Sequence, residues 1–147
     1  MALAATESLG SNDPSLRAAI AHNLAYNCLA ASEYDDAVTY VEEALRHFDA
    51  VTDAAWGAQF LVTAAFAYLC RDRLDDAMRA IDAAEPRASG GEREKYVHYI
   101  RGEIARRRGD RDEAKRQFEK LEPFYPGIPT LTEMLLSMNL APFLLPE

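Results

Sequence analysis

Apolar residues recur along this chain at the spacing of an α-helix. The clearest stripe places six of them on one helix face: Ala37, Tyr40, Val41, Ala44, Leu45 and Phe48. The residues between them are polar: Thr39, Glu42, Glu43 and Arg46. One face is therefore suited to a core and the other to water, which predicts an amphipathic helix.

The same small and apolar positions occur three times, with offsets of 12, 4 and 3 residues each time. The sets are Ala25, Ala37, Val41 and Ala44; Ala65, Ala77, Ile81 and Ala84; and Gly102, Ala114, Phe118 and Leu121. Alanine or glycine at a helix crossing lets two backbones approach to about 8–10 Å between axes, so that larger neighbours interdigitate. We therefore expect three antiparallel helix pairs of similar construction.

These segments resemble the tetratricopeptide repeat, a helix-turn-helix unit whose second helix carries an alanine and, four positions later, a bulky apolar residue. The resemblance covers about residues 17–121 and implies an all-α fold: a right-handed superhelical stack of three such helix pairs plus a C-terminal capping helix. One domain is expected over 1–147, with repeats at about 14–50, 52–88 and 92–122 and a capping helix and apolar tail at 130–147. The alanine-to-alanine steps of 40 and 37 residues exceed the usual period of about 34. This long period is similar to that of sensor regions in bacterial transcription regulators and quorum-sensing peptide receptors.

Capping and breaking residues predict where the helices begin and end. Asp13 followed by Pro14 provides a cap and a proline at the first helical position, so the first long helix is expected to begin near Pro14. An acidic pair precedes the alanine of each second helix, where carboxylates meet the positive end of the helix dipole. Gly90 and Gly91 interrupt the chain, and the stretch from Thr130 to Glu133 is a capping box that begins a last helix.

Composition limits the class of protein. With 147 residues, 49% of them hydrophobic, the chain fits one domain with a continuous core. The N-terminal segment has no basic start and no run reaches the length that spans a bilayer, so we expect a cytoplasmic protein without membrane contact. Cys28 and Cys70 are expected to be buried small hydrophobes and not a disulfide pair.

Residues that could carry catalysis are scattered. The chain has three histidines on different predicted helices, His22, His47 and His98, without partners at metal-ligand spacing. It contains no H-E-x-x-H, no phosphate-binding glycine loop and no G-x-S-x-G motif. Carboxylates on solvated helix faces lack the burial that moves a pKa toward neutrality. We therefore expect a protein that is not an enzyme and holds no metal or cofactor.

Charge is unevenly distributed. Residues 1–86 carry 14 acidic and 5 basic side chains, whereas residues 87–120 carry 7 and 11. Five arginines gather in the third segment: Arg101, Arg106, Arg107, Arg108 and Arg111. Phosphate contacts are one interpretation. The net charge of -8 and the interleaved carboxylates disfavour nucleic acid and favour an acidic protein surface, including that of another copy of this chain.

In tetratricopeptide arrays the first helices of successive repeats line a concave groove, and the resemblance implies the same surface here. Nine residues are expected to face a ligand: His22, Asn23, Tyr26, Val62, Phe66, Tyr96, Tyr99, Glu103 and Arg106. Such an aromatic groove fits an apolar peptide or an amphipathic helix. The implied function is a non-catalytic protein- or peptide-binding module, including the sensor or partner-binding region of a bacterial regulator. The alternative interpretation of the aromatics is packing between neighbouring helices.

The C-terminal segment indicates a second function class. A closing helix is expected from the apolar stripe Leu131, Met134, Leu135 and Met138. Four other apolar residues lie off that stripe or beyond Pro142 and are expected to contact another chain: Leu136, Leu140, Phe143 and Leu144. This pattern favours a self-associating assembly unit that forms a homodimer. A tail folded along its own last repeat, and a secretion-type chaperone for an apolar client segment, are the alternatives.

Removal of residues 141–147 tests self-association. If the apolar tail carries the contact, the full chain is a dimer at micromolar concentration and the shortened chain is a monomer, because the apolar area of the contact is lost. Light scattering gives the molar mass of both. A full chain that is already monomeric refutes the expectation, and a dimer that survives the truncation moves the interface elsewhere.

Overall fold

The computed structural model describes residues 13–50, 54–88, 91 and 93–137. Within these residues the chain forms α-helices and two short 3-10 turns, with no strand. The α-helices are α2 (Pro14–Ala30), α3 (Tyr34–Arg46), α4 (Ala54–Cys70), α5 (Leu74–Ala88), α6 (Glu94–Arg107), α7 (Arg111–Glu119) and α8 (Leu131–Ser137). The 3-10 turns are η1 (Phe48–Ala50) and η2 (Glu122–Phe124). The predicted all-α class is confirmed.

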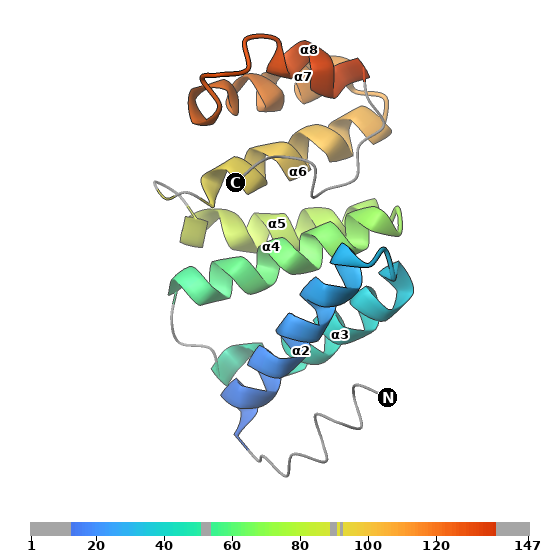
Figure 1. Cartoon of the computed structure of the whole chain (residues 1–147), viewed down its shortest axis with the longest axis vertical. Coiled ribbons are helices and arrows are strands. Elements are labelled where there is room, and N and C mark those ends of the chain that lie inside the picture. Colours follow the sequence, from blue (N-terminus) through green and yellow to red (C-terminus); the bar gives the residue numbers. More distant parts are fainter. Residues whose placement is uncertain (1–12, 51–53, 89–90, 92, 138–147) are drawn as a thin grey trace.

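Helices that are adjacent in sequence pack together as pairs. α2 packs on α3, α4 on α5 and α6 on α7, and α8 lies on α7. The pairs follow one another along the long axis of the molecule (Figure 1). Neighbouring pairs touch through α3 and α4 and through α5 and α6, and the first helices α2, α4 and α6 also touch in that order.

The turn inside each pair has the same geometry three times. Three residues at matching positions adopt a left-handed backbone, with φ of 61° at Ser32, 58° at Asp72 and 83° at Gly109. The residue after each one donates its backbone N–H to a carbonyl five positions earlier, at 2.8, 2.9 and 2.9 Å. This bond closes the end of the first helix, because it satisfies a carbonyl that has no partner within the helix. The sequence repeat is therefore also a repeat of local structure.

Most helix boundaries lie where the sequence predicts them. α2 begins at Pro14, and the Asp13 carboxylate accepts the Ser15 backbone N–H at 3.0 Å. The three acidic pairs occupy the first turns of α3, α5 and α7. α8 begins at Leu131, inside the predicted capping box. Met138 and the apolar tail that follows it lie outside the described residues.

The core is centred on α4, which carries no charged residue. All ten residues from Phe60 to Leu69 are buried. α2, α3, α5 and α6 contact this helix. Burial of apolar area contributes about 25 cal/mol per Å², so the enclosure of α4 is a large favourable contribution to folding.

The third pair departs from the other two at its helix crossing. Gly102 stands where the other pairs have Ala25 and Ala65, and Phe118 stands where they have Val41 and Ile81. A Cβ atom on Gly102 would lie only 2.4 Å from Cε1 and 2.5 Å from Cδ1 of Phe118. Phe118 is fully buried, so its ring has little room to move. The missing Cβ of Gly102 therefore makes the space that the larger ring fills.

This size compensation gives a double-mutant test. We expect Gly102→Ala to destabilise the parent chain, because overpacking costs about 1–3 kcal/mol and exceeds the helix-propensity gain of up to about 1 kcal/mol. In a Phe118→Ile background, which copies the second pair, we expect the same change to be stabilising. Urea unfolding of the four chains measures the coupling. Additive effects of the two substitutions would contradict the proposed fit.

Candidate functional site

Five of the nine residues predicted to face a ligand lie in the interior. His22, Val62, Phe66, Tyr99 and Glu103 are all buried. This placement differs from the expectation of an open groove, because neighbouring helices approach closely enough to cover these side chains. It favours the alternative interpretation, packing between helices, for these five positions.

Three of the predicted aromatic residues, Phe66, Tyr96 and Tyr99, form one cluster with Phe118. The Phe66 ring meets Tyr96 edge-on, with centroids 5.9 Å apart, and lies 6.3 Å from the Tyr99 ring. Tyr99 lies in turn 6.4 Å from Phe118. Burial, followed by the nearby Glu103 carboxylate, raises the pKa of Tyr99. The cluster joins α4, α6 and α7, and its geometry is that of favourable aromatic packing.

Glu103 and Arg106 are brought together in an ionic cluster around a buried carboxylate. The Glu103 carboxylate is fully buried and accepts bonds from Nε of Arg106 and Nε of Arg107, both at 2.9 Å. Arg107 also donates from Nη1 to the backbone carbonyl of Leu69 at 2.6 Å. A buried carboxylate is tolerated when it is paired in this way. The cluster holds α6 against the end of α4.

His22 belongs to a chain of polar contacts that crosses three helices. Its Nε2 lies 2.8 Å from Oγ1 of Thr63, and its ring stacks on Phe60 with centroids 4.7 Å apart. Gln59 donates to the same Thr63 oxygen at 3.3 Å. Arg93, at the start of α6, donates to Oε1 of Gln59 at 3.0 Å. Gln59 and Arg93 were not predicted as site residues, because nothing in their local sequence shows that these two side chains contact each other.

The remaining predicted residues are accessible. Asn23 and Tyr26 are exposed on α2, and Tyr96 and Arg106 are half-buried on α6. Trp56 on α4 is also exposed, and its ring meets Phe60 edge-on at 5.1 Å. Trp56 was not predicted as a site residue, because a tryptophan near the start of an apolar helix is expected to be buried with its neighbours.

Of the residues expected to contact a second chain, one lies in the described part of the molecule. Leu136 on α8 is buried with Leu131 and Leu135 in the core of its own chain. Leu136 was expected to contact another chain, but it is buried in its own chain because the buried face of α8 is broader than the predicted stripe. Leu140, Phe143 and Leu144 lie outside the described residues.

Carboxylates of the same chain pair with Arg101, Arg106, Arg107 and Arg108 of the third unit. Arg101 reaches Asp82 at 2.8 Å and Glu85 at 3.2 Å, both on α5. Arg108 reaches Asp75 at 2.5 Å. The acidic surface expected for these arginines is therefore supplied at least in part by the preceding unit of the same chain.

One of these ion pairs is repeated between the first and second units. Arg71 lies 2.7 Å from Asp35, and the two residues occupy the same unit positions as Arg108 and Asp75. Exposed pairs of this kind contribute only about 0–1 kcal/mol each. The same contact is therefore present at both joints between successive units.

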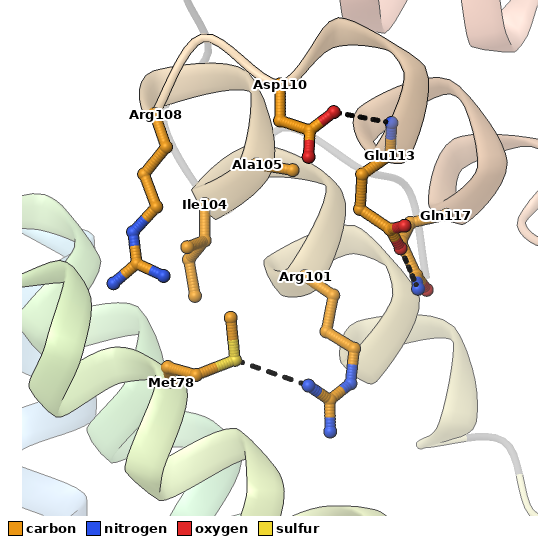
Figure 2. A pocket seen from close by; sticks show the side chains of 8 residues that line it. All are labelled: Met78, Arg101, Ile104, Ala105, Arg108, Asp110, Glu113 and Gln117. Atoms are coloured by element: carbon orange, nitrogen blue, oxygen red, sulfur yellow. Dashed lines mark hydrogen bonds between the residues drawn. The ribbon is translucent and has the colours of Figure 1, made fainter.

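A pocket of about 470 Å³ opens between α5, α6 and the start of α7. Its lining residues are Met78, Arg101, Ile104, Ala105, Arg108, Asp110, Glu113 and Gln117. Figure 2 shows Arg108 at the upper left and Arg101 at the lower centre, with Ile104 and Met78 between them, and Asp110, Glu113 and Gln117 toward the upper right. Asp110 caps α7 by accepting the Glu113 backbone N–H at 3.1 Å.

The two cysteines are free thiols, with Cys28 buried and Cys70 half-buried. Burial raises the pKa of Cys70 to about 11, which leaves the thiol protonated and unreactive at neutral pH. Among the described residues, no cluster of three or more histidine, cysteine or acidic side chains could bind a metal ion. No helix in the same residues has the length and apolar character needed to cross a membrane.

Comparison of the chain with protein-family models, with curated proteins and with solved structures finds no match.

The environment of His22 predicts a pH dependence of stability. Burial lowers the pKa of His22 below its ordinary value of 6.5, with a smaller opposing contribution from the Asn23 side chain. Below about pH 6.5 the unfolded chain binds a proton that the folded chain does not, so stability falls as the pH drops toward the folded-state pKa. We expect His22→Phe, which keeps a ring against Phe60, to weaken this loss.

Melting temperatures at pH 7.5 and pH 5.5 measure the effect. The difference between the two pH values should be smaller in His22→Phe than in the parent. His98→Gln is the matched control, since it removes a histidine that is hydrogen-bonded to Gln117 on α7. An equal pH dependence in the parent and His22→Phe would contradict the assignment.

Proposed function

We propose that this protein is a non-catalytic helical-repeat module that binds a protein or peptide partner. The observation that carries the proposal is the threefold recurrence of one helix-turn-helix unit, with matching left-handed residues and matching hydrogen bonds. Repeated units of this kind stack into extended surfaces that suit partner binding. The proposed arrangement of the units is the right-handed tetratricopeptide-like superhelix that the sequence resembles.

The proposed contact surface is the row of first helices. α2, α4 and α6 touch in sequence order, so the side chains on their shared side are presented together. Tyr26, Trp56 and Tyr96 are the accessible aromatics on these helices, and Asn23 adds an amide. Tyrosine and tryptophan are effective anchors because they offer a large rigid area with a polar tip. The interior aromatics then act as support for this surface.

A regulatory role in the cytoplasm fits these properties. Two free cysteines, one of them buried, suit a reducing compartment. The long repeat period is similar to that of sensor regions in bacterial regulators, and we propose that the module serves as such a sensor or partner-binding region. The repeat supports partner binding as the class of function, and the experiment below tests whether a partner is captured.

Partner capture with exposed-aromatic variants tests the proposed surface. We expect Tyr26→Ala and Trp56→Ala each to reduce the amount of protein captured from a lysate of the native host, because an anchor is lost. Phe124→Ala is the matched control, since Phe124 is exposed to 38% and Tyr26 to 39%, but Phe124 lies on η2, outside the row of first helices.

Circular dichroism should show that all variants keep the parent helix content. Equal capture by the parent, both test variants and the control would contradict the proposed surface. A parent chain that captures nothing above empty beads would contradict the binding function itself.

A further inference from the structure

The pocket between α5, α6 and α7 corresponds to a site that the chain itself fills one unit earlier. Ala105 follows Gly102 by three residues, and Tyr68 follows Ala65 by three residues, so the two occupy the same unit position. Tyr68 and Ala105 are both buried, and the smaller Ala105 side chain lines the pocket. The pocket therefore marks the place of a missing aromatic side chain.

The contacts of Tyr68 show how this chain binds a phenol at that position. The Arg73 guanidinium lies over the Tyr68 ring, 4.8 Å from its centroid. The Tyr68 hydroxyl donates to Oε2 of Glu42 at 3.4 Å. The ring is thus held by a cation over its face and a carboxylate at its hydroxyl, and both interactions are favourable for a phenol.

The pocket also combines arginines with carboxylates, but at other unit positions, because Asp110 stands where the second unit has Arg73 and Asp82 stands where the first unit has Glu42. Ile104 and Met78 supply apolar surface, and Arg101 and Arg108 flank it (Figure 2). Asp82 and Asp75 on α5 hold the two guanidinium groups at 2.8 and 2.5 Å. A guanidinium that is paired at its edge can still stack through its planar face on an aromatic ring. Both arginines therefore have a carboxylate partner on α5 beside the pocket.

The opposite wall provides hydrogen-bond acceptors for a hydroxyl group. Asp110 and Glu113 line this wall, and the Glu113 carboxylate accepts bonds from Gln117 and Arg116. These bonds lower the pKa of Glu113, so the group remains an anionic acceptor. A carboxylate has about four acceptor sites, which leaves capacity for a further donor.

We propose that this pocket binds the phenol ring of a tyrosine side chain presented by a partner protein. The choice of a protein ligand rests on the proposed partner-binding function, whereas the choice of a phenol rests on the comparison with Tyr68. The Arg101 side chain, which stands where the second unit has Ala64, takes part of the space, and a pocket of about 470 Å³ remains. This volume lies within the range of small-ligand sites.

Two probes test the proposal by NMR: p-cresol, which is a free phenol, and N-acetyl-L-tyrosinamide, which carries peptide bonds on both sides of the tyrosine. Both should shift the methyl signals of Met78, Ile104 and Ala105. A dissociation constant on the order of 1 mM is expected for p-cresol, because this places its about eight non-hydrogen atoms between the ligand efficiencies of the best very small ligands and of drug-sized ones. Nuclear Overhauser contacts between the ring protons and these methyl groups place the probe without any substitution.

Three variants localise the binding further. Ala105→Tyr should fill the pocket and weaken p-cresol binding at least about tenfold, which is 1.4 kcal/mol. Phe124→Ala should leave binding unchanged, because Phe124 lies on η2 and does not line the pocket. Tyr68→Ala should open the corresponding site between the first two units, so that p-cresol binds at two places and raises the melting temperature of this variant more than that of the parent.

The outcomes separate the parts of the proposal. Binding of both probes, with the expected variant effects, supports it. Binding of p-cresol alone overturns the protein source of the phenol, and the absence of binding by either probe overturns the site. Equal p-cresol binding by Ala105→Tyr and the parent would also overturn the site. None of these results depends on partner capture through Tyr26 and Trp56, so failure here is distinguishable from failure of the proposed function.

Discussion

The enclosure of α4 is the constraint on which the rest of the described structure depends. This helix carries no charged residue and buries ten consecutive positions, so it must be covered on every side. α2, α3, α5 and α6 supply that cover. The second helices of the pairs can then be amphipathic, with carboxylates and arginines directed to water. α4 is thus the interior of the described structure, and α5 together with the pairs on each side forms its cover.

The third unit differs from the second in the size of side chains at two neighbouring places, and at each place another side chain changes in size in the opposite direction. At the crossing of α6 and α7, the loss of a Cβ atom at Gly102 is matched by the larger ring of Phe118. At the neighbouring position, the loss of an aromatic ring at Ala105 is matched only in part by the longer side chain of Arg101. The first substitution gives a packed core, and the second gives a pocket. Both differences are found by comparing residues at equivalent positions of the second and third units.

The repeat pattern was sufficient to predict the helices, because small residues at fixed offsets and caps such as Asp13 are local signals. It was not sufficient to predict which first-helix side chains remain accessible. His22 and Tyr26 lie four residues apart on one face of α2, yet His22 is covered by Phe60 and Tyr26 is exposed. That difference depends on contacts between units, which a single helix pattern does not contain. The pairing of Arg101 with Asp82 was missed for the same reason, since the charge pattern alone does not identify the partner.

The recurring ion pair has a consequence for modular construction. Each pair joins a donor arginine at the end of one unit's first helix to an acceptor aspartate at the start of the preceding unit's second helix, as in Arg108 with Asp75. The second unit carries both a donor, Arg71, and an acceptor, so tandem copies of it would form the pair at every joint. The first unit has Ala31 at the donor position, so it can supply the acceptor of this pair but not the donor. Any rearranged order that keeps the pair at every joint therefore needs an arginine at this position in each unit after the first.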